Sequence, residues 1–452
     1  MTISTETIAR HASRLAPRYT SYPTAPHFHR GIGAASYRDW LAELPDKASL
    51  SLYVHIPFCD TLCWFCGCHT KITRQYQPIA AYLTALEHEI EAVAAAAPRG
   101  ARVTHIHWGG GSPTILSASD IRRLSRTLRD AFAWASDAEF AVEIDPRGLD
   151  EERIDALGEC GLTRVSVGVQ DFDPAVQAAI NRAQSVEETR RVIEACRARG
   201  ARSLNIDAIY GLPGQHATQL ARTLDEVIAL APDRIALFGY AHVPWMKRHQ
   251  SLIPEDDLPG PLERHGLAEM AGDTLLAAGF ERIGVDHFAR PSDPLAVTAR
   301  EGRVRRNFQG YTVDPADALI GLGASAIGRL PRGYIQNEPA IAEYRRLVHG
   351  QGLAIVRGVE FSEEDKIRGD VIERLMCDLA FSAKSLRGRP DGLARELIET
   401  ARTVIAEDRD GFVAPTTDGF MVTERGRPFV RAIATRFDAY LATTTARHSA
   451  AV

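Results

Sequence analysis

Four of the seven cysteines in this chain lie within ten positions of one another, in the stretch "IPFCDTLCWFCGCHT" at residues 56–70. They are Cys59, Cys63, Cys66 and Cys68. Thiols this close together could form disulfides, bind zinc or carry an iron–sulfur cluster. The total is odd and the other three cysteines are scattered, which is a poor pattern for a secreted disulfide framework. We therefore expect a reducing compartment and chemistry at the thiols.

The C-x3-C-x2-C spacing of Cys59, Cys63 and Cys66 favours an iron–sulfur cluster. A structural zinc site normally takes two ligand pairs, often on separate knuckles. A thioredoxin-like redox pair would use Cys63 and Cys66 and leave Cys59 without a role. Thiolates are soft ligands that suit iron and sulfide. Three protein ligands leave one iron of a four-iron cluster open, and an open iron is a place for chemistry rather than for simple electron storage.

Six β-rich runs follow one another from about residue 50, separated by amphipathic helical patterns. The runs are "LSLYVHIP", "VTHIHWGG", "EFAVEIDP", "RVSVGVQ", "SLNIDAIYGLP" and "RIALFGYAH". This alternation predicts a parallel sheet, either doubly wound or curved into a partial barrel, and in both folds ligands gather at the C-terminal strand ends. We therefore place the active site at the polar and glycine residues that end these runs: Gly109, Gly110, Gly111, Glu143, Asp145, Gln170, Asp171, Asp207 and Tyr240.

Three parts of the chain are expected. Residues 1–49 include "PRYTSYPTAPHF", which is too rich in proline and aromatic residues for a regular element, and this segment should wrap over the active site. Residues 50–350 should form the catalytic domain, an α/β fold built as a partial (β/α)6 barrel of parallel strands. Residues 351–452 should form a small, mainly helical domain with a hairpin at "GFVAPTTDGFMVTERGR". We expect this domain to be a structural lid.

Composition excludes several partner classes. The formal net charge of -5 gives no general attraction to nucleic acid or to an anionic membrane. The N-terminus lacks the apolar core of a secretory signal, and no stretch of about 18 uncharged apolar residues could span a bilayer. We expect a cytoplasmic monomer that binds neither nucleic acid nor membrane.

With Phe65 before the third cysteine and a predicted strand before the first, the motif resembles the signature of the radical S-adenosylmethionine (SAM) superfamily. The resemblance implies that Cys59, Cys63 and Cys66 hold a [4Fe-4S] cluster whose open iron chelates SAM. An electron from the cluster would cleave the sulfonium to a 5′-deoxyadenosyl radical. "HWGGGSPT" fits this reading because glycines let a backbone approach a ligand closely. Glu143, at the end of the third run, could take the two hydroxyls of a ribose.

A longer series of motifs resembles the oxygen-independent coproporphyrinogen III oxidases. In order, between about residues 17 and 340, they are "PRYTSYPTAPHF", "YVHIPFC", "CGC", "HWGGGSPT", "EIDPR", "SVGVQDFDP", "NRAQ", "NIDAIYGLP", "DHFARP" and "NFQGYT". The resemblance implies decarboxylation of two propionates of coproporphyrinogen III to vinyl groups, giving protoporphyrinogen IX in haem biosynthesis. The reaction would also require an electron donor and an electron acceptor, which the sequence does not identify.

The same resemblance implies that two SAM molecules bind at once. Contacts to the cluster-bound molecule would come from Tyr53, Phe65, Gly110, Glu143 and Ile327. Contacts to the second molecule would come from Gly111, Ser112, Gln170, Arg182, Asp207 and Ala241. Ser112 stands where the family often has threonine, a change that keeps the hydroxyl.

Cys68 cannot be a fourth cluster ligand if SAM holds the open iron. The family pattern C-x3-C-x2-C-x-C retains this cysteine, and we predict that it is a catalytic residue that assists turnover by hydrogen or electron transfer. The alternative is a small buried residue without a duty. His55 and His107 are interpreted as core histidines. The scattered cysteines are also interpreted as core residues: Cys160, Cys196 and Cys377.

A tetrapyrrole with several carboxylates needs cations and flat apolar walls. The candidate cations are Arg18, Arg290, and Arg305 or Arg306. The candidate walls are Tyr19, Tyr22 and Tyr311. Each arginine alone is more often a solvated or salt-bridged surface group.

A haem-binding chaperone related to this family is the main alternative function. That branch resembles this chain in its cluster motif and glycine run but usually lacks the "PRYTSYPT" segment and the cysteine corresponding to Cys68. Both are present here, which favours the enzyme. A zinc-stabilised binding protein, the third reading, would contain zinc and no iron.

Overall fold

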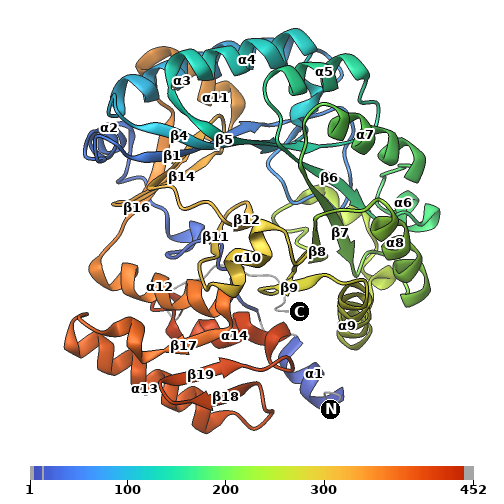
Figure 1. The fold of residues 1–452 in the computed structure, drawn as a ribbon, viewed down its shortest axis with the longest axis vertical. Coiled ribbons are helices and arrows are strands. Elements are labelled where there is room, and N and C mark those ends of the chain that lie inside the picture. Colours follow the sequence, from blue (N-terminus) through green and yellow to red (C-terminus); the bar gives the residue numbers. More distant parts are fainter. Residues whose placement is uncertain (1–4, 13–14, 442–452) are drawn as a thin grey trace.

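The computed structural model describes residues 5–12 and 15–441 and is built around a twelve-stranded sheet (Figure 1). Seven neighbouring strands of this sheet run parallel, in the order β13, β1, β4, β5, β6, β7 and β8. Their bounds are Ala318–Leu322, Ser49–Ile56, Arg102–Gly110, Ala133–Ile144, Arg164–Gln170, Ser203–Tyr210 and Arg234–Gly239. All six predicted strands are confirmed. Because the order from β1 to β8 never reverses, the sheet is not doubly wound, and the partial barrel is confirmed.

Amphipathic helices cover the outer face of the parallel strands (Figure 1). They are α3 (Gln77–Ala96), α4 (Ala118–Ala131), α5 (Glu151–Glu159), α6 (Pro174–Ala179), α7 (Val186–Ala198), α8 (Ala217–Ala229) and α9 (Pro261–Ala277). Ser117 caps α4 by accepting a hydrogen bond from the backbone N–H of Asp120. Apart from α6, the apolar faces of these helices and the buried strands form one continuous core. No helix in the described part of the chain is long and apolar enough to cross a membrane.

Antiparallel strands extend the sheet at both edges. Beyond β13 lie β14 (Ile327–Leu330), β15 (Gly333–Asn337) and β16 (Ile355–Glu360), and beyond β8 lie β10 (His287–Ala289) and β9 (Glu281–Ile283). Two small ladders stand apart: β2 (Phe58–Cys59) with β3 (Lys71–Ile72), and β11 (Arg305–Asn307) with β12 (Gly310–Thr312). Helices α10 (Pro294–Arg300) and α11 (Ile341–Gln351) complete this part.

The C-terminal part packs below the barrel in Figure 1. Its helices are α12 (Glu363–Asp378), α13 (Asp391–Glu407) and α14 (Val430–Ala434). A three-stranded sheet joins β17 (Ala380–Ser382), β19 (Gly419–Val422) and β18 (Val413–Thr416), and the last two form the expected hairpin. Since β16 still belongs to the main sheet, the mainly helical part begins with α12.

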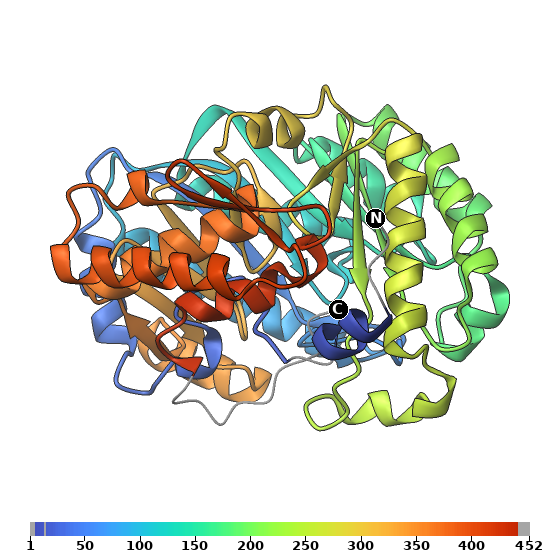
Figure 2. The same cartoon turned by 90° about the horizontal axis from the view of Figure 1, so that it is seen from below.

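The N-terminal segment bridges the barrel and the C-terminal part. It contains α1 (Thr5–Ala12) and α2 (Ala34–Ala42), which the sequence analysis did not anticipate. Helix α1 lies against α9 (Figure 2), and Ile8, Tyr19 and Tyr22 are buried in the apolar cluster of the C-terminal part. The stretch 17–28 has one short 3-10 turn, at Ala25–His27, as its proline and aromatic content predicts.

Candidate functional site

Cys59 ends β2 and the other three clustered cysteines lie in the loop between β2 and β3, over the C-terminal ends of the parallel strands. Cys63 is buried, Cys59 and Cys66 are half-buried, and Cys68 is exposed, and all are free thiols. The four residues line a single cavity together with strand-end residues such as Glu143. The thiols therefore face the edge of the barrel where ligands bind in folds of this kind.

Polar side chains point at two of the sulfur atoms. Nη2 of Arg147 and Nη1 of Arg182 lie 3.5 and 3.6 Å from Sγ of Cys63. The hydroxyl of Thr70 lies 3.6 Å from Sγ of Cys59. Nearby cations and hydrogen-bond donors favour the thiolate, which is the form that binds a metal. At Cys59, however, burial outweighs the Thr70 hydrogen bond and raises the pKa of the thiol to about 12.

Cys66 and Cys68 are not equivalent. The backbone N–H of Cys68 donates to Sγ of Cys66 at 3.4 Å. Hydrogen bonding from the Cys68 side chain, joined by that backbone contact, lowers the pKa of Cys66 to about 7. The same side-chain interaction raises the pKa of Cys68 above its usual range. The geometry thus favours a thiolate at Cys66 and a protonated thiol at Cys68.

Two segments hold the cysteine loop in place. The side-chain amide of Asn181 donates to the carbonyl of Leu62 at 2.8 Å, and the N–H of Trp64 donates to the carbonyl of Ile180 at 2.9 Å. The segment after β8 contacts the loop's carbonyls through Lys247 to Cys68, His249 to Cys66 and Gln250 to Phe65, at 2.8, 2.7 and 2.8 Å. The contact from Asn181 gives the "NRAQ" motif a positioning role that the sequence did not reveal.

Arg182 connects the cysteine loop to the strand ends. Its Nη1 lies 3.2 Å from Oδ2 of Asp145, and its Nη2 donates to the carbonyl of Gly168 at 2.6 Å. Arg147 reaches the same carboxylate at 2.6 Å. Burial alone would raise the pKa of Asp145, but the two guanidinium groups outweigh burial and hold that pKa below its usual value. Asp145 is therefore an ionised link between the two arginines.

The glycine run makes room for the protein's own side chains. A Cβ on Gly109 would lie 2.6 Å from Oε1 of Glu143, and a Cβ on Gly110 would lie 2.6 Å from Cε1 of His55. Gly110 also has a φ of 118°, which disfavours any other residue. The sequence predicted a close approach of backbone to ligand, and the structure adds that Glu143 and His55 need the same space.

Glu143 is held as an ionised acceptor. Its Oε1 accepts from Nε2 of His107 at 3.0 Å, and its Oε2 accepts from the N–H of Gly110 at 3.0 Å. Burial would raise the pKa of Glu143, but these two donors overcome it, and the pKa lies below its ordinary value. The ring of His107 stacks on that of Tyr53 with centroids 5.9 Å apart. His107 is therefore a positioning residue, not the core histidine that the sequence analysis expected.

Asp207 has the opposite electrostatic character. Burial, followed by the negative charge of Glu143, raises its pKa to about 6. Its oxygens accept from Nδ2 of Asn205 at 2.8 Å and from Oγ of Ser166 at 3.2 Å. Two carboxyl groups on β5 and β7, the strands on either side of β6, thus have pKa values shifted in opposite directions, a pattern typical of functional sites.

Most of the predicted site residues line the cysteine cavity. They are Cys59, Cys63, Cys66, Cys68, Phe65, Gly110, Gly111, Glu143, Gln170, Arg182 and Asp207. Tyr53 is set back from it, where its hydroxyl bonds to Nδ1 of His55 at 2.9 Å. Ser112 contacts Thr114 through its hydroxyl, Ala241 lines a second cavity, and Ile327 packs beside Phe28.

Sequence reasoning missed Arg147 and His107. Arg147 follows Asp145 by two residues in "EIDPR", so a polar pair at a strand end was the available signal. His107 precedes the glycine run on β4, and the directly adjacent strand β5 contains Glu143 one residue before its end. The interpretation of the scattered cysteines is confirmed, because all three are buried: Cys160, Cys196 and Cys377.

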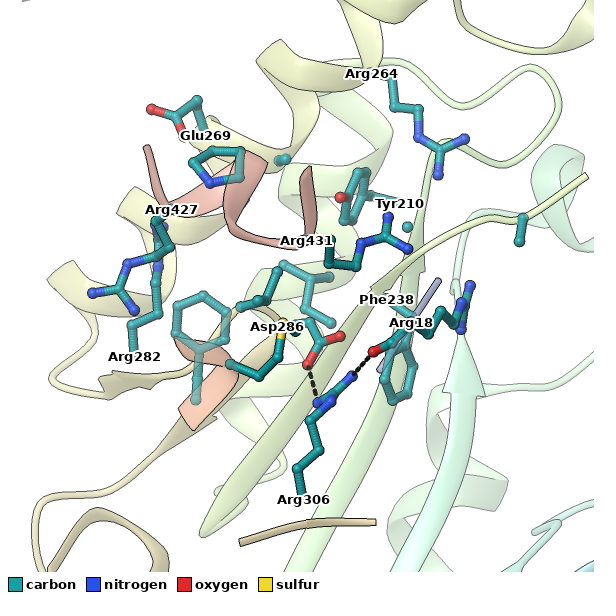
Figure 3. Close-up of a pocket in the computed structure, with 18 residues that line it drawn as sticks. Arg18, Tyr210, Phe238, Arg264, Glu269, Arg282, Asp286, Arg306, Arg427 and Arg431 are labelled. Carbon is teal, nitrogen blue, oxygen red and sulfur yellow. Dashed lines mark hydrogen bonds and ion pairs between the residues drawn. The ribbon is translucent and has the colours of Figure 1, made fainter. Parts of the chain in front are cut away.

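The second cavity is lined by arginines (Figure 3). Of the candidate substrate cations, Arg18 and Arg306 line it. Arg290 instead donates to the carbonyl of Ala278, and Arg305 pairs with Glu373 at 3.6 Å on the surface. The candidate walls lie nearby: Tyr19 and Tyr22 line a third cavity, and Tyr311 stacks under Arg306.

The donor set fits an iron–sulfur cluster. Within the described residues, no three His, Cys, Asp or Glu side chains form a group that could hold a metal ion. A cluster does not require such convergence, because each iron takes its own thiolate. Three thiols around one cavity, with cations beside Cys63, supply soft ligands and compensate their negative charge.

Comparison with known families gives a match in the first half of the chain. The family described as the radical SAM superfamily matches residues 53–227. That span begins in β1 and ends in α8, so it includes the cysteine loop, the glycine run and all the strand-end carboxylates discussed above.

Individual relatives match nearly the whole chain. The oxygen-independent coproporphyrinogen III oxidase of Paracoccus denitrificans is 47% identical over 436 residues, covering 96% of each chain. That of Escherichia coli is 41% identical over 428 residues, covering 94% of this chain and 93% of its own. A solved structure of coproporphyrinogen III oxidase from Escherichia coli, described as a radical SAM enzyme, superposes with a TM-score of 0.89 at 40% identity and covers 94% of this chain and 98% of its own.

Proposed function

This chain belongs to the oxygen-independent coproporphyrinogen III oxidase family of radical SAM enzymes, and on that premise we propose that it converts coproporphyrinogen III to protoporphyrinogen IX in haem biosynthesis. Two propionate side chains would each become a vinyl group. The observation that carries the proposal is the shared cavity, in which the three motif cysteines face Glu143, Asp207 and Arg182.

Cys59, Cys63 and Cys66 are the proposed ligands of three irons of a [4Fe-4S] cluster. When bound, the cluster and SAM supply a 5′-deoxyadenosyl radical that removes a hydrogen atom from a propionate carbon, which ordinary side-chain bases cannot deprotonate. The chain's own task is to bind, orient and exclude water. Arg147 and Arg182 compensate the negative charge of the thiolates on one side of the site.

Glu143 is the proposed acceptor for the ribose hydroxyls of the cluster-bound SAM. Its lowered pKa keeps it ionised, and each of its oxygens keeps lone pairs beyond the one used by His107 or Gly110. Tyr53, Phe65 and Ile327 complete the proposed contacts to this molecule.

We further propose a second SAM site. Its proposed contacts are Gly111, Ser112, Gln170, Arg182, Asp207 and Ala241. In support, Gln170 ends β6, Asp207 lies on the adjacent strand β7, and both line the cysteine cavity, whereas Ala241 lines the arginine cavity. Asp207, with its raised pKa, could exchange a proton near neutral pH.

Two redox partners belong to this proposal. Each propionate that becomes a vinyl group loses one hydrogen atom to the adenosyl carbon, one carbon dioxide and one electron. An electron donor must therefore reduce the cluster and an electron acceptor must take the substrate electron. We propose that the protein acts as a monomer with these two partners, whose identity the sequence does not give.

An anaerobic turnover assay tests the function. The protein is reconstituted with iron and sulfide and incubated with coproporphyrinogen III, SAM and a chemical reductant. Protoporphyrinogen IX and two carbon dioxide molecules per substrate are expected, and the triple variant Cys59→Ser, Cys63→Ser, Cys66→Ser should produce neither. Cleavage of SAM without decarboxylation would instead favour a haem-binding protein. Counting bound SAM by equilibrium dialysis tests the stoichiometry, with two molecules per chain expected and one in Asp207→Ala.

A further inference from the structure

Six arginines line the second cavity, which lies between the C-terminal ends of β7 and β8 and the C-terminal helices (Figure 3). They are Arg18, Arg264, Arg282, Arg306, Arg427 and Arg431. Among the described residues, the carboxylates that line this cavity are Glu269 and Asp286. Guanidinium groups thus outnumber carboxylates three to one, which produces a strongly positive local field in a protein whose net charge is negative.

Arg306 is buried, and two of its guanidinium nitrogens have no hydrogen-bond partner among the described residues. Its side chain is 7% exposed, and its Nη1 lies 4.0 Å from Oδ1 of Asp286, beyond hydrogen-bond distance. That Oδ1 already bonds to Nδ1 of His287 at 2.7 Å. Within the described part of the protein, Nε and Nη1 of Arg306 have no hydrogen-bond partner. Buried, unsatisfied donors on a cation are costly unless an anion meets them.

Arg264 and Arg282 repeat the pattern on the other walls of the cavity. The Nε atom of each is buried without a hydrogen-bond partner among the described residues. Burial lowers the pKa of Arg264, and burial together with the charge of Arg427 lowers the pKa of Arg282. The guanidinium of Arg264 lies 5.9 Å from the ring centroid of Tyr210. No carboxylate of the described residues forms an ion pair with it. These cations are positioned at an electrostatic cost.

Most of the remaining lining is apolar. It includes Leu237, Phe238, Val285, Phe288 and Met376. A cavity with both characters suits a ligand with a flat apolar body and several anionic groups at its edge. Strand β7 contributes to both cavities, because its Asp207 lines the cysteine cavity and its Tyr210 lines this one.

We propose that the arginine cavity binds the propionate carboxylates of the tetrapyrrole substrate, with Arg264 and Arg306 as the principal cations. The inference rests on the proposed function for the identity of the ligand. The arginines would hold the propionates that are not reacting. This would fix the macrocycle relative to the cysteine cavity and direct the reacting propionate toward the proposed cluster. The arginines then act on binding and positioning rather than on the chemical step.

Binding can be measured without turnover. The probe is coproporphyrin III, the stable oxidised form of the substrate, titrated against the reconstituted enzyme by fluorescence; its tetramethyl ester has the same macrocycle without charges. The free acid should bind at least tenfold more tightly than the ester, and its affinity should fall as salt is raised. Equal affinity for acid and ester in the unmodified enzyme would overturn the proposal without the need for any variant.

Substitutions then assign the residues. Arg264→Gln and Arg306→Gln should each weaken binding of the free acid about tenfold or more and leave binding of the ester unchanged, and Arg264→Lys should restore part of the loss. The matched control is Arg300→Gln, a surface arginine paired with Glu281, which should bind both probes as the unmodified enzyme does. Because the Nε of Arg264 is buried without a partner among the described residues, and burial and then the charge of Arg18 disfavour its cation, its replacement should not lower the thermal midpoint, whereas loss of a purely structural arginine would.

Kinetics separates this proposal from the proposed function. With coproporphyrinogen III, both glutamine variants should raise KM about tenfold and change kcat by less than about threefold. Unchanged KM and unchanged acid binding in both variants would refute the arginine site. An enzyme that binds the acid through these arginines but releases no carbon dioxide would refute the proposed function and leave the carboxylate site standing.

Discussion

Nη1 of Arg182 lies 3.6 Å from Sγ of Cys63, although the two residues are 119 positions apart in the chain. The same nitrogen lies 3.2 Å from Oδ2 of Asp145. A single buried guanidinium, itself a proposed contact of the second SAM molecule, therefore connects a proposed cluster ligand with Asp145 at the end of β5. Any change at this side chain should affect both sites together.

Arg182→Lys should lower turnover at least tenfold. Lysine keeps the charge but cannot reach Cys63, Asp145 and the carbonyl of Gly168 at once. Losing one charge-assisted hydrogen bond costs about 1.5–3 kcal/mol, or roughly a tenfold to hundredfold loss of affinity. KM for SAM and iron content per chain are the measurements. Arg122→Lys, which alters a surface pair with Glu159, is the control, and normal kinetics in Arg182→Lys would contradict the connection.

Gly110→Ala should lower both the thermal midpoint and turnover. The new Cβ would lie 2.6 Å from the ring of His55, and a φ of 118° strains any residue with a side chain by about 1–3 kcal/mol. Movement of this backbone would also displace the N–H that donates to Glu143. Gly214→Ala is the matched control, because Gly214 has a φ of 67° but nothing within 4 Å of its Cβ position. Equal effects of the two substitutions would show that strain alone matters there.

The six strands of the barrel could be predicted because buried parallel strands read as continuous apolar runs. The seventh parallel strand, β13, could not, because its partner β1 lies more than 260 positions earlier in the chain. The cluster loop was predictable from local cysteine spacing. The arginine cavity was not, because its cations come from the N-terminal segment, the barrel and the C-terminal part, and no local pattern marks such an assembly.

A similar limit applies to single residues. Arg18 and Arg306 were identified as candidate cations because they stand in motifs, and they do meet in one cavity. Arg290 and Arg305 stand in equally plausible positions, yet one contacts a backbone carbonyl and the other a surface carboxylate. Side-chain direction depends on the packing of neighbouring elements, and a single sequence does not encode it in a readable form.

Stability should depend on pH through Glu89. This carboxyl on α3 is 1% exposed and accepts from the N–H of Gly323 and the hydroxyl of Tyr344, each at 2.7 Å. Burial raises its pKa from 4.5 to about 7. Because the folded state binds the proton more tightly than the unfolded state, the contribution to stability is lost as pH rises from about 4.5 to about 7.

Glu89→Gln should remove that loss. The thermal midpoint of the variant, relative to the unmodified protein, should rise between pH 5 and pH 7.5 by the equivalent of about 2 kcal/mol. Differential scanning under argon at both pH values is the measurement. Glu343→Gln, at an exposed carboxylate paired with Arg346, should change nothing. Parallel pH curves for Glu89→Gln and the unmodified protein would exclude this role for Glu89.

Cys68→Ser should keep the cluster and lose turnover of coproporphyrinogen III. The Cys68 side chain is not a proposed iron ligand, yet it is exposed and lines the cavity that also contains Glu143 and Asp207. Serine preserves the backbone N–H that donates to Sγ of Cys66, so iron and sulfide content should remain normal. It removes the thiol that we expect to transfer a hydrogen atom or an electron.

Two controls bracket this experiment. Cys66→Ser removes a proposed ligand and should lower the iron content, whereas Cys160→Ala changes a buried core cysteine and should leave both iron content and turnover intact. Iron analysis, SAM binding and protoporphyrinogen formation are measured on the same preparations. Full turnover in Cys68→Ser would show that this residue has no catalytic role. A variant that retains iron and SAM binding but forms no product would place the missing step after the cofactor is bound, at the thiol itself.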